Sequence, residues 1–308
     1  MPRTPKHLPI GHFRQRRAKT GYTFSQGVFW KTPAIEDFDK NPFYDSANIV
    51  EVIKPVSASK TADDYYDFDG YSSETVLADF IKVVDSVSAL RFCNSYGLPC
   101  RCDGIFIDER PVAYAYFEGN DISNILNEAY TLRICQIIVN AYSKDDEKAQ
   151  AEYFENKFET KITPLFGDDN LFTFCEIATK RETEFVGVIG FGFSNNVALD
   201  GAMQFLRKIV EKKMRASGAT LTLLPRQRGQ GSKMRLQAFV VPDDLLGVMW
   251  HRFTDGAGTR ETIVECEICG QWFRALRADA RKCSDKCRQR SHRNGTSTPR
   301  KKRAASTQ

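Results

Sequence analysis

Four cysteines near the C-terminus have the residue type and the spacing of a metal site. Cys266 and Cys269 form a C-x2-C pair followed by Gly270, and Cys283 and Cys287 form a C-x3-C pair after thirteen intervening residues. Two sulfurs four residues apart lie on one face of a helix, and a glycine after the first pair permits a tight turn. Four thiolates complete the tetrahedral coordination of a structural zinc ion. The spacing therefore predicts one Zn²⁺ held by these four residues.

Disulfide bonding and metal catalysis account less well for the cysteine cluster. Disulfides would need an exported protein, but the N-terminus lacks the apolar centre of a secretory signal and no apolar run is long enough to cross a membrane. We therefore expect a cytoplasmic chain with no membrane role. A catalytic zinc would keep an open coordination position beside an acid or a base. His292 lies five residues beyond Cys287 and is left out of the site, because four thiolates already satisfy the ion.

The rest of the chain offers few groups for catalysis. Its four histidines are His7, His12, His251 and His292. Three further cysteines, Cys93, Cys100 and Cys102, have a C-x6-C-x-C spacing without a metal knuckle, so we expect them at a helix end and a turn. The segment GVIGFGF matches neither a dinucleotide-binding nor a phosphate-loop motif. We expect a binding protein and not an enzyme.

Charge is distributed unevenly along the chain. Residues 271–308 contain twelve Lys and Arg against two Asp, a net charge of +10, which leaves −5 on residues 1–270. The first twenty residues contain six Lys and Arg and no acidic residue. Such basic ends are typical of chains that contact a polyanion, although a basic tail can also be simply solvated.

The basic C-terminal end is the predicted nucleic-acid interface. A zinc ion with four thiolates carries a charge of about −2, which neighbouring cations offset. The positive charge of this end exceeds that need, so we expect the surplus to contact phosphates, on DNA more than on RNA. The candidate contacts are Arg281, Arg288, Arg290, Arg293, Arg300, Lys301, Lys302 and Arg303. The alternative is a finger in which zinc only folds the C-terminus for a protein partner.

Hydrophobic periodicity predicts an α+β fold with a mainly helical core and a few short strands. Helical spacing covers residues 73–96, 122–142 with a charged continuation to about 158, 196–217 and 243–253. The β-prone runs are residues 48–56, 171–179, 185–193, 219–225 and 235–242, the last two as a pair. Gly256 and Gly258 predict a hinge before the cysteine segment.

Length and composition set the expected domain organisation. A chain of 308 residues with 42% hydrophobic content can bury a sizeable core. We expect a basic irregular leader (1–46) with one helical or extended piece at 23–30, an α+β core (47–256), a four-cysteine zinc finger (257–294) and a disordered basic tail (295–308). The core is expected to sense a small ligand or to bind a protein partner.

The cysteine segment also resembles a known family. The motifs C-x-x-C-G-x-x-F and R-x-C-S-x-x-C-R-x-R resemble the C-terminal treble-clef zinc fingers of uncharacterised bacterial proteins, related to the CGNR-type fingers of predicted transcription regulators. The likeness covers roughly residues 243–293, although Arg-Gln-Arg follows Cys287 where the CGNR finger has Gly-Asn-Arg. It implies the same four ligands, with Arg288 and Arg290 on the helix after the last one, and it suggests a role as a bacterial regulator.

Overall fold

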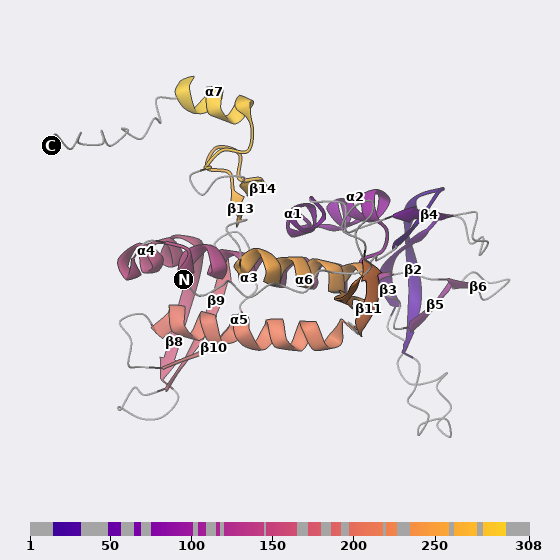
Figure 1. Cartoon of the computed structure of the whole chain (residues 1–308), viewed down its shortest axis with the longest axis horizontal. Coiled ribbons are helices and arrows are strands. Elements are labelled where there is room, and N and C mark those ends of the chain that lie inside the picture. Colours follow the sequence, from indigo (N-terminus) through magenta and orange to yellow (C-terminus); the bar gives the residue numbers. More distant parts are fainter. Residues whose placement is uncertain are drawn as a thin grey trace.

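The computed structural model confirms the predicted fold class. It describes residues 15–31, 49–56, 65–68, 75–100, 104–108, 115–117, 120–144, 146–164, 172–179, 186–191, 197–217, 220–226, 235–258, 262–275 and 280–293. Within these residues the core is mainly helical, and the strands form small sheets (Figure 1). No helix in this part of the chain combines the length and the apolar composition needed to cross a bilayer.

Helix α3 (Ile122–Tyr142) forms the centre of the core. No residue from 128 to 142 is exposed, and a helix buried in this way is packed on all sides. The helices that contact it in the described chain are α1 (Val76–Ile81), α2 (Ser86–Tyr96), α4 (Glu147–Lys157), α5 (Val197–Ala216) and α6 (Leu245–Gly258). The helices predicted over 122–142 and 196–217 are confirmed, as is the one beginning near 243.

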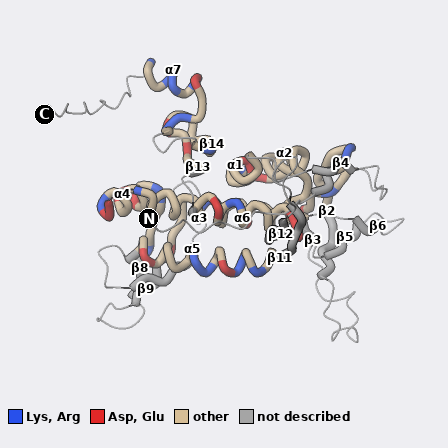
Figure 2. Tube along the Cα trace, viewed as in Figure 1, with Lys and Arg blue, Asp and Glu red and all other residues tan. Residues whose placement is uncertain are grey.

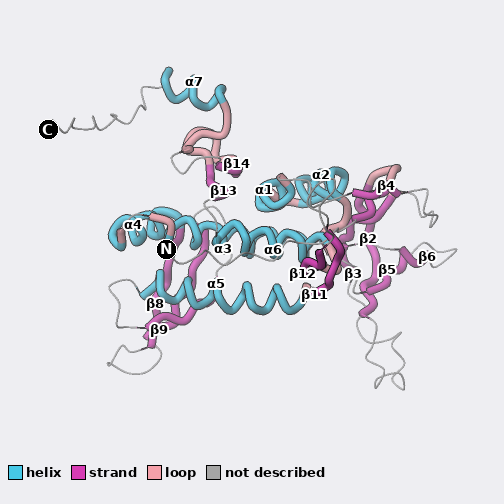
Figure 3. Tube along the Cα trace, viewed as in Figure 1, coloured by secondary structure: helices cyan, strands magenta, loops and turns pink. Residues whose placement is uncertain are grey.

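Antiparallel sheets lie at the two ends of this helical layer (Figure 3). The largest has the order β6-β5-β2-β3-β7 and consists of β2 (Tyr22–Lys31), β3 (Ile49–Pro55), β5 (Gly104–Asp108), β6 (Ala115–Phe117) and β7 (Asn120–Asp121). A second has the order β10-β9-β8 and consists of β8 (Phe158–Pro164), β9 (Phe172–Thr179) and β10 (Val186–Phe191). Two further pairs are β1 (Gln15–Ala18) with β4 (Tyr65–Phe68) and β11 (Thr220–Arg226) with β12 (Arg235–Val241).

The β-prone runs predicted from the sequence correspond to β3, β9, β10, β11 and β12. Residues 15–31 fall within the expected irregular leader, but here they form β1 and β2, and β2 is the middle strand of the largest sheet. The extended alternative for residues 23–30 is therefore the one that the structure shows. The boundaries of the leader, core, finger and tail stay predictions.

The single helix predicted over 73–96 is wrong, because the chain forms two helices there. The Asp85 carboxylate accepts a hydrogen bond of 2.7 Å from the backbone N–H of Ser88, and the Ser88 hydroxyl accepts one from the N–H of Asp85. This capping box begins α2. The buried Arg133 guanidinium donates to the carbonyls of Ile81 and Val83 at the end of α1. Local capping and one buried cation thus interrupt a continuous helical periodicity.

The charged continuation after residue 142 is likewise a separate helix. Asp146 accepts a hydrogen bond of 2.8 Å from the N–H of Ala149 and begins α4. Gly256 and Gly258, predicted as a hinge, lie in the last turn of α6. The chain is therefore helical, and not a hinge, up to Gly258, where α6 ends, and residues 259–261 lie outside the described residues.

Removing the α2 cap should destabilise the core. We expect Asp85→Ala to lower the free energy of unfolding by about 1 kcal/mol, because an orphan backbone N–H is left without its acceptor. Hydrogen bonds from Ser88 lower the pKa of Asp85. The cap is therefore stabilising above the ordinary aspartate pKa near 4 and is lost as pH falls through the lowered value.

Urea unfolding at neutral pH measures this difference. Val87→Ala is the control, because Val87 is an exposed residue in the first turn of the same helix and its truncation should cost less than about 0.5 kcal/mol. Equal unfolding midpoints for Asp85→Ala and the unmodified chain would contradict the capping role.

Candidate metal centre

A short hairpin and a helix position the four cysteines. Strand β13 (Thr262–Glu265) pairs antiparallel with β14 (Trp272–Ala275), and helix α7 (Asp285–Arg293) follows. Cys266 and Cys269 lie in the turn between the two strands. Gly270 has a φ of 68°, as expected for the glycine after a metal knuckle, and its N–H donates to the Cys266 carbonyl at 2.8 Å. The turn thereby directs both sulfurs to the same side.

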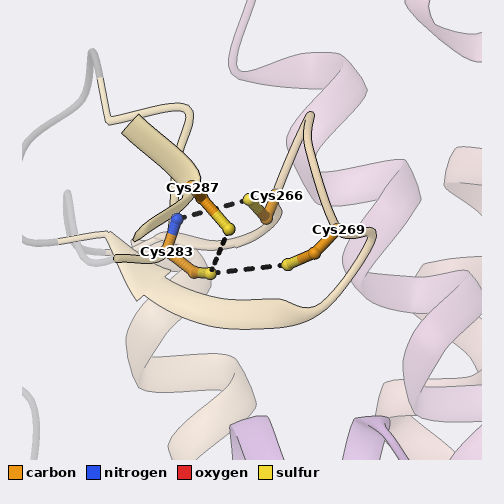
Figure 4. A group of neighbouring side chains, drawn as sticks. All are labelled: Cys266, Cys269, Cys283 and Cys287. Carbon is orange, nitrogen blue, oxygen red and sulfur yellow. Dashed lines mark hydrogen bonds between the residues drawn. The ribbon is translucent and has the colours of Figure 1, made fainter. Parts of the chain in front are cut away.

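The four sulfurs converge on one point (Figure 4). The Sγ atoms of Cys269 and Cys283 are 3.5 Å apart and those of Cys283 and Cys287 are 3.6 Å apart. All four sulfur atoms lie within 4.8 Å of one another. A tetrahedron with metal–sulfur distances of about 2.3 Å has edges of about 3.8 Å. The predicted cysteines therefore form a cluster that could hold one metal ion.

Backbone hydrogen bonds fix the second pair of cysteines against the first. The N–H of Cys283 points to the Cys266 sulfur at 3.4 Å, and the N–H of Glu267 donates to the Arg281 carbonyl at 3.0 Å. The Ser284 hydroxyl accepts a hydrogen bond of 3.4 Å from the N–H of Cys287 at the start of α7. Cys287 thus lies in the first helical turn, close to the turn that carries the first cysteine pair.

Cys266 and Cys283 have different pKa values because their surroundings differ. Burial alone would raise the pKa of Cys266, but hydrogen bonds from backbone N–H groups, first that of Cys283, lower this pKa to about 6. Burial raises the pKa of Cys283 to about 12. Without a metal, a thiolate is therefore favoured at Cys266 over Cys283, and a bound cation would favour ionisation of Cys283. A metal ion bound at this cluster would accordingly release protons, and its affinity would rise with pH.

The hairpin of the cluster is packed onto the core. Strand β14 contacts α1 and β13 contacts α3. Trp272, which is 6% exposed, is buried together with the main core residues. Asn140 of α3 donates to the Ile263 carbonyl at 2.9 Å, and Lys157 of α4 forms an ion pair of 2.7 Å with Glu265. Sequence reasoning missed these contacts, because no local pattern indicates that residues 123 and 108 positions apart will meet.

The structure describes four of the eight predicted nucleic-acid contacts. Arg281 lies 4.0 Å from the Glu267 carboxylate, and Arg288 forms an ion pair with Asp285. Arg290 and Arg293 are exposed on α7, where Figure 2 shows several cations. Arg300, Lys301, Lys302 and Arg303 lie outside the described residues. The four described arginines therefore lie on α7 or just before it, and two of them, Arg281 and Arg288, lie beside carboxylates.

Three other candidates that the structure describes, Cys93, Cys100 and His251, are not part of the cysteine cluster. Cys93 is fully buried in the core and Cys100 is half-buried, whereas Cys102 lies outside the described residues. His251 is 8% exposed on α6, with its Nδ1 atom 3.7 Å from the Asp255 carboxylate.

Comparisons of this chain with protein-family models, curated proteins and solved structures found no match. The likeness of the cysteine motif to known fingers therefore stays an expectation. What the chain does has to be argued from the cluster and from the helix that follows it.

Loss of one cysteine should abolish stable metal binding. We expect Cys283→Ser to lower the bound metal per chain from about one to near zero, because three thiolates leave the tetrahedron incomplete. Native mass spectrometry with elemental analysis measures the content. Cys100→Ser is the control, because Cys100 lies outside the cluster and should leave the metal in place. Full metal retention in Cys283→Ser would contradict the assignment of this ligand.

Proposed function

We propose that this protein binds one structural zinc ion through Cys266, Cys269, Cys283 and Cys287 and uses the basic C-terminal segment to bind nucleic acid. DNA is the preferred partner. The chain acts as a binding protein and not as an enzyme, and a small ligand or a protein partner of the core is left open. The observation that carries the proposal is an exposed, positively charged helix directly attached to a four-cysteine cluster.

Zinc is the metal that this donor set favours. Soft thiolate ligands in a tetrahedral arrangement are typical of Zn²⁺ or of iron–sulfur sites. Of the two, Zn²⁺ is the one that has no redox chemistry and commonly serves as a structural ion. A knuckle that supplies two ligands and a helix start that supplies two more also suit the treble-clef arrangement implied by the motif. Four protein ligands leave no open position, which supports a structural ion and not a catalytic one.

The charge of α7 supports nucleic-acid binding. Lys286, Arg288, Arg290 and Arg293 against Asp285 give this nine-residue helix a net charge of +3. Figure 1 shows α7 standing away from the helices of the core. Such a helix can approach a phosphate backbone without the acidic body of the protein coming between them.

Helix dimensions favour duplex DNA over duplex RNA. An α-helix with its side chains is about 10–12 Å wide, and the major groove of B-DNA is about 12 Å wide. The major groove of A-form RNA is too narrow for a helix to enter. A regulatory role is supported only by the resemblance to the fingers of predicted transcription regulators.

The direct test is binding to a labelled DNA duplex. We expect fluorescence anisotropy to show binding by the zinc-loaded chain that weakens steeply with salt, because phosphate contacts release counterions. Cys283→Ser should weaken this binding, because α7 is deprived of its anchor. A lack of binding even at low salt would contradict nucleic-acid binding and would favour a zinc finger that folds the C-terminus for a protein partner.

Deleting residues 299–308 tests the contribution of the tail. This deletion removes Arg300, Lys301, Lys302 and Arg303. We expect the slope of log affinity against log salt on duplex DNA to become shallower by about 0.9 for each phosphate that the tail no longer neutralises. Zinc content should stay unchanged, because no ligand is removed. An unchanged slope would exclude the tail from the interface while leaving a role for α7.

A further inference from the structure

Only a narrow strip of helix α7 is buried against the rest of the protein, and we call this strip the seam. Cys287 and Ser291 are buried and lie four residues apart, on one face of the helix. Every other residue of α7 is exposed: Asp285, Lys286, Arg288, Gln289, Arg290, His292 and Arg293. The helix therefore presents two flanks to solvent, one on each side of the seam.

The two flanks differ in composition. At about 100° per residue, Lys286, Arg290 and Arg293 lie within an arc of about 60° on one side of the seam. Asp285, Arg288 and His292 fall on the other side by the same reckoning. We call Lys286, Arg290 and Arg293 the cationic flank. Gln289 lies between the two flanks by the same reckoning, and it lines one hollow of the surface together with the three residues of the cationic flank.

Ion pairing increases this difference. Arg288 is paired with Asp285 one turn away, and Arg281, before the helix, lies 4.0 Å from Glu267. Within the described part of the chain, no carboxylate forms an ion pair with Lys286, Arg290 or Arg293. The cationic flank thus carries three unneutralised charges, while the charges of the opposite flank cancel when His292 is neutral.

We propose that the cationic flank, Lys286, Arg290 and Arg293, is the surface of α7 that contacts consecutive phosphates of one DNA strand. Arg288 takes no part in this contact. This inference rests on the proposed nucleic-acid function and deepens it. It adds Lys286, which is not among the contacts expected from the sequence, and it removes Arg281 and Arg288 from those contacts.

The length of the flank fits this partner. Residues 286 and 293 are about 10 Å apart along the helix axis, and phosphates of one DNA strand recur about every 3.4 Å along the duplex. Three cations over this distance can each meet a phosphate. A cation already paired with a carboxylate would first have to give up its partner, so it gains less from the same contact.

The experiment compares two arginines that differ in flank but not in type. Arg290→Ala and Arg288→Ala each remove one exposed arginine from α7 and lower the net charge by one. We expect Arg290→Ala to weaken binding to duplex DNA at 100 mM salt about eightfold and to make the salt slope shallower by about 0.9. Arg288→Ala should change both by much less. Titrations at several salt concentrations give both quantities.

A third variant separates charge from folding. Arg290→Lys keeps the cation and should retain the slope of the unmodified chain, while zinc content and circular dichroism check that every variant is folded. Equal weakening in Arg288→Ala and Arg290→Ala, or a larger effect in Arg288→Ala, would overturn the flank and leave DNA binding in place. If the unmodified chain binds no DNA, the proposed function fails and the flank proposal falls with it.

Discussion

Helix α3 is buried along most of its length, so its polar side chains have to find partners inside the protein. Several of those partners belong to other elements. Arg133 holds the end of α1, Asn140 holds β13, and Glu128 joins Lys213 of α5 to Trp250 of α6. Because an unpaired buried charge is costly, these bonds fix the arrangement of the elements around α3 more specifically than apolar packing alone. The metal centre takes its position from this network.

The metal centre joins two parts that are held in different ways. The hairpin is fixed to the core by Trp272, by Asn140 and by the ion pair of Lys157 with Glu265. Helix α7 buries only Cys287 and Ser291, and an isolated helix of nine residues is too short to be stable in water. The cysteine cluster thus connects a hairpin that is packed on the core to a helix that is too short to be stable without it.

Sequence patterns predicted those features of this protein that depend on residues close together in the chain. The spacing of Cys266 to Cys287, the positive φ of Gly270 and the apolar surface of α3 were all legible in the sequence. The break between α1 and α2 at Asp85 was missed, because the helical periodicity of the sequence continues across it. The capping box that begins α2 depends on the geometry of the hydrogen bonds between Asp85 and Ser88. Strand β2 and the burial of Trp272 in the main core depend on partners distant in sequence. The four clustered cysteines were therefore easier to predict than the surface that supports them.

The weak attachment of α7 limits when the protein can act. With an ion bound as proposed, the four thiolates would hold the basic side chains of α7 in a fixed orientation. In a cell short of that metal, the core and the hairpin would persist while the helix lost its anchor. The proposed interaction surface would then form only in those molecules that had acquired the ion, so metal supply would set the fraction of the protein able to bind its proposed partner.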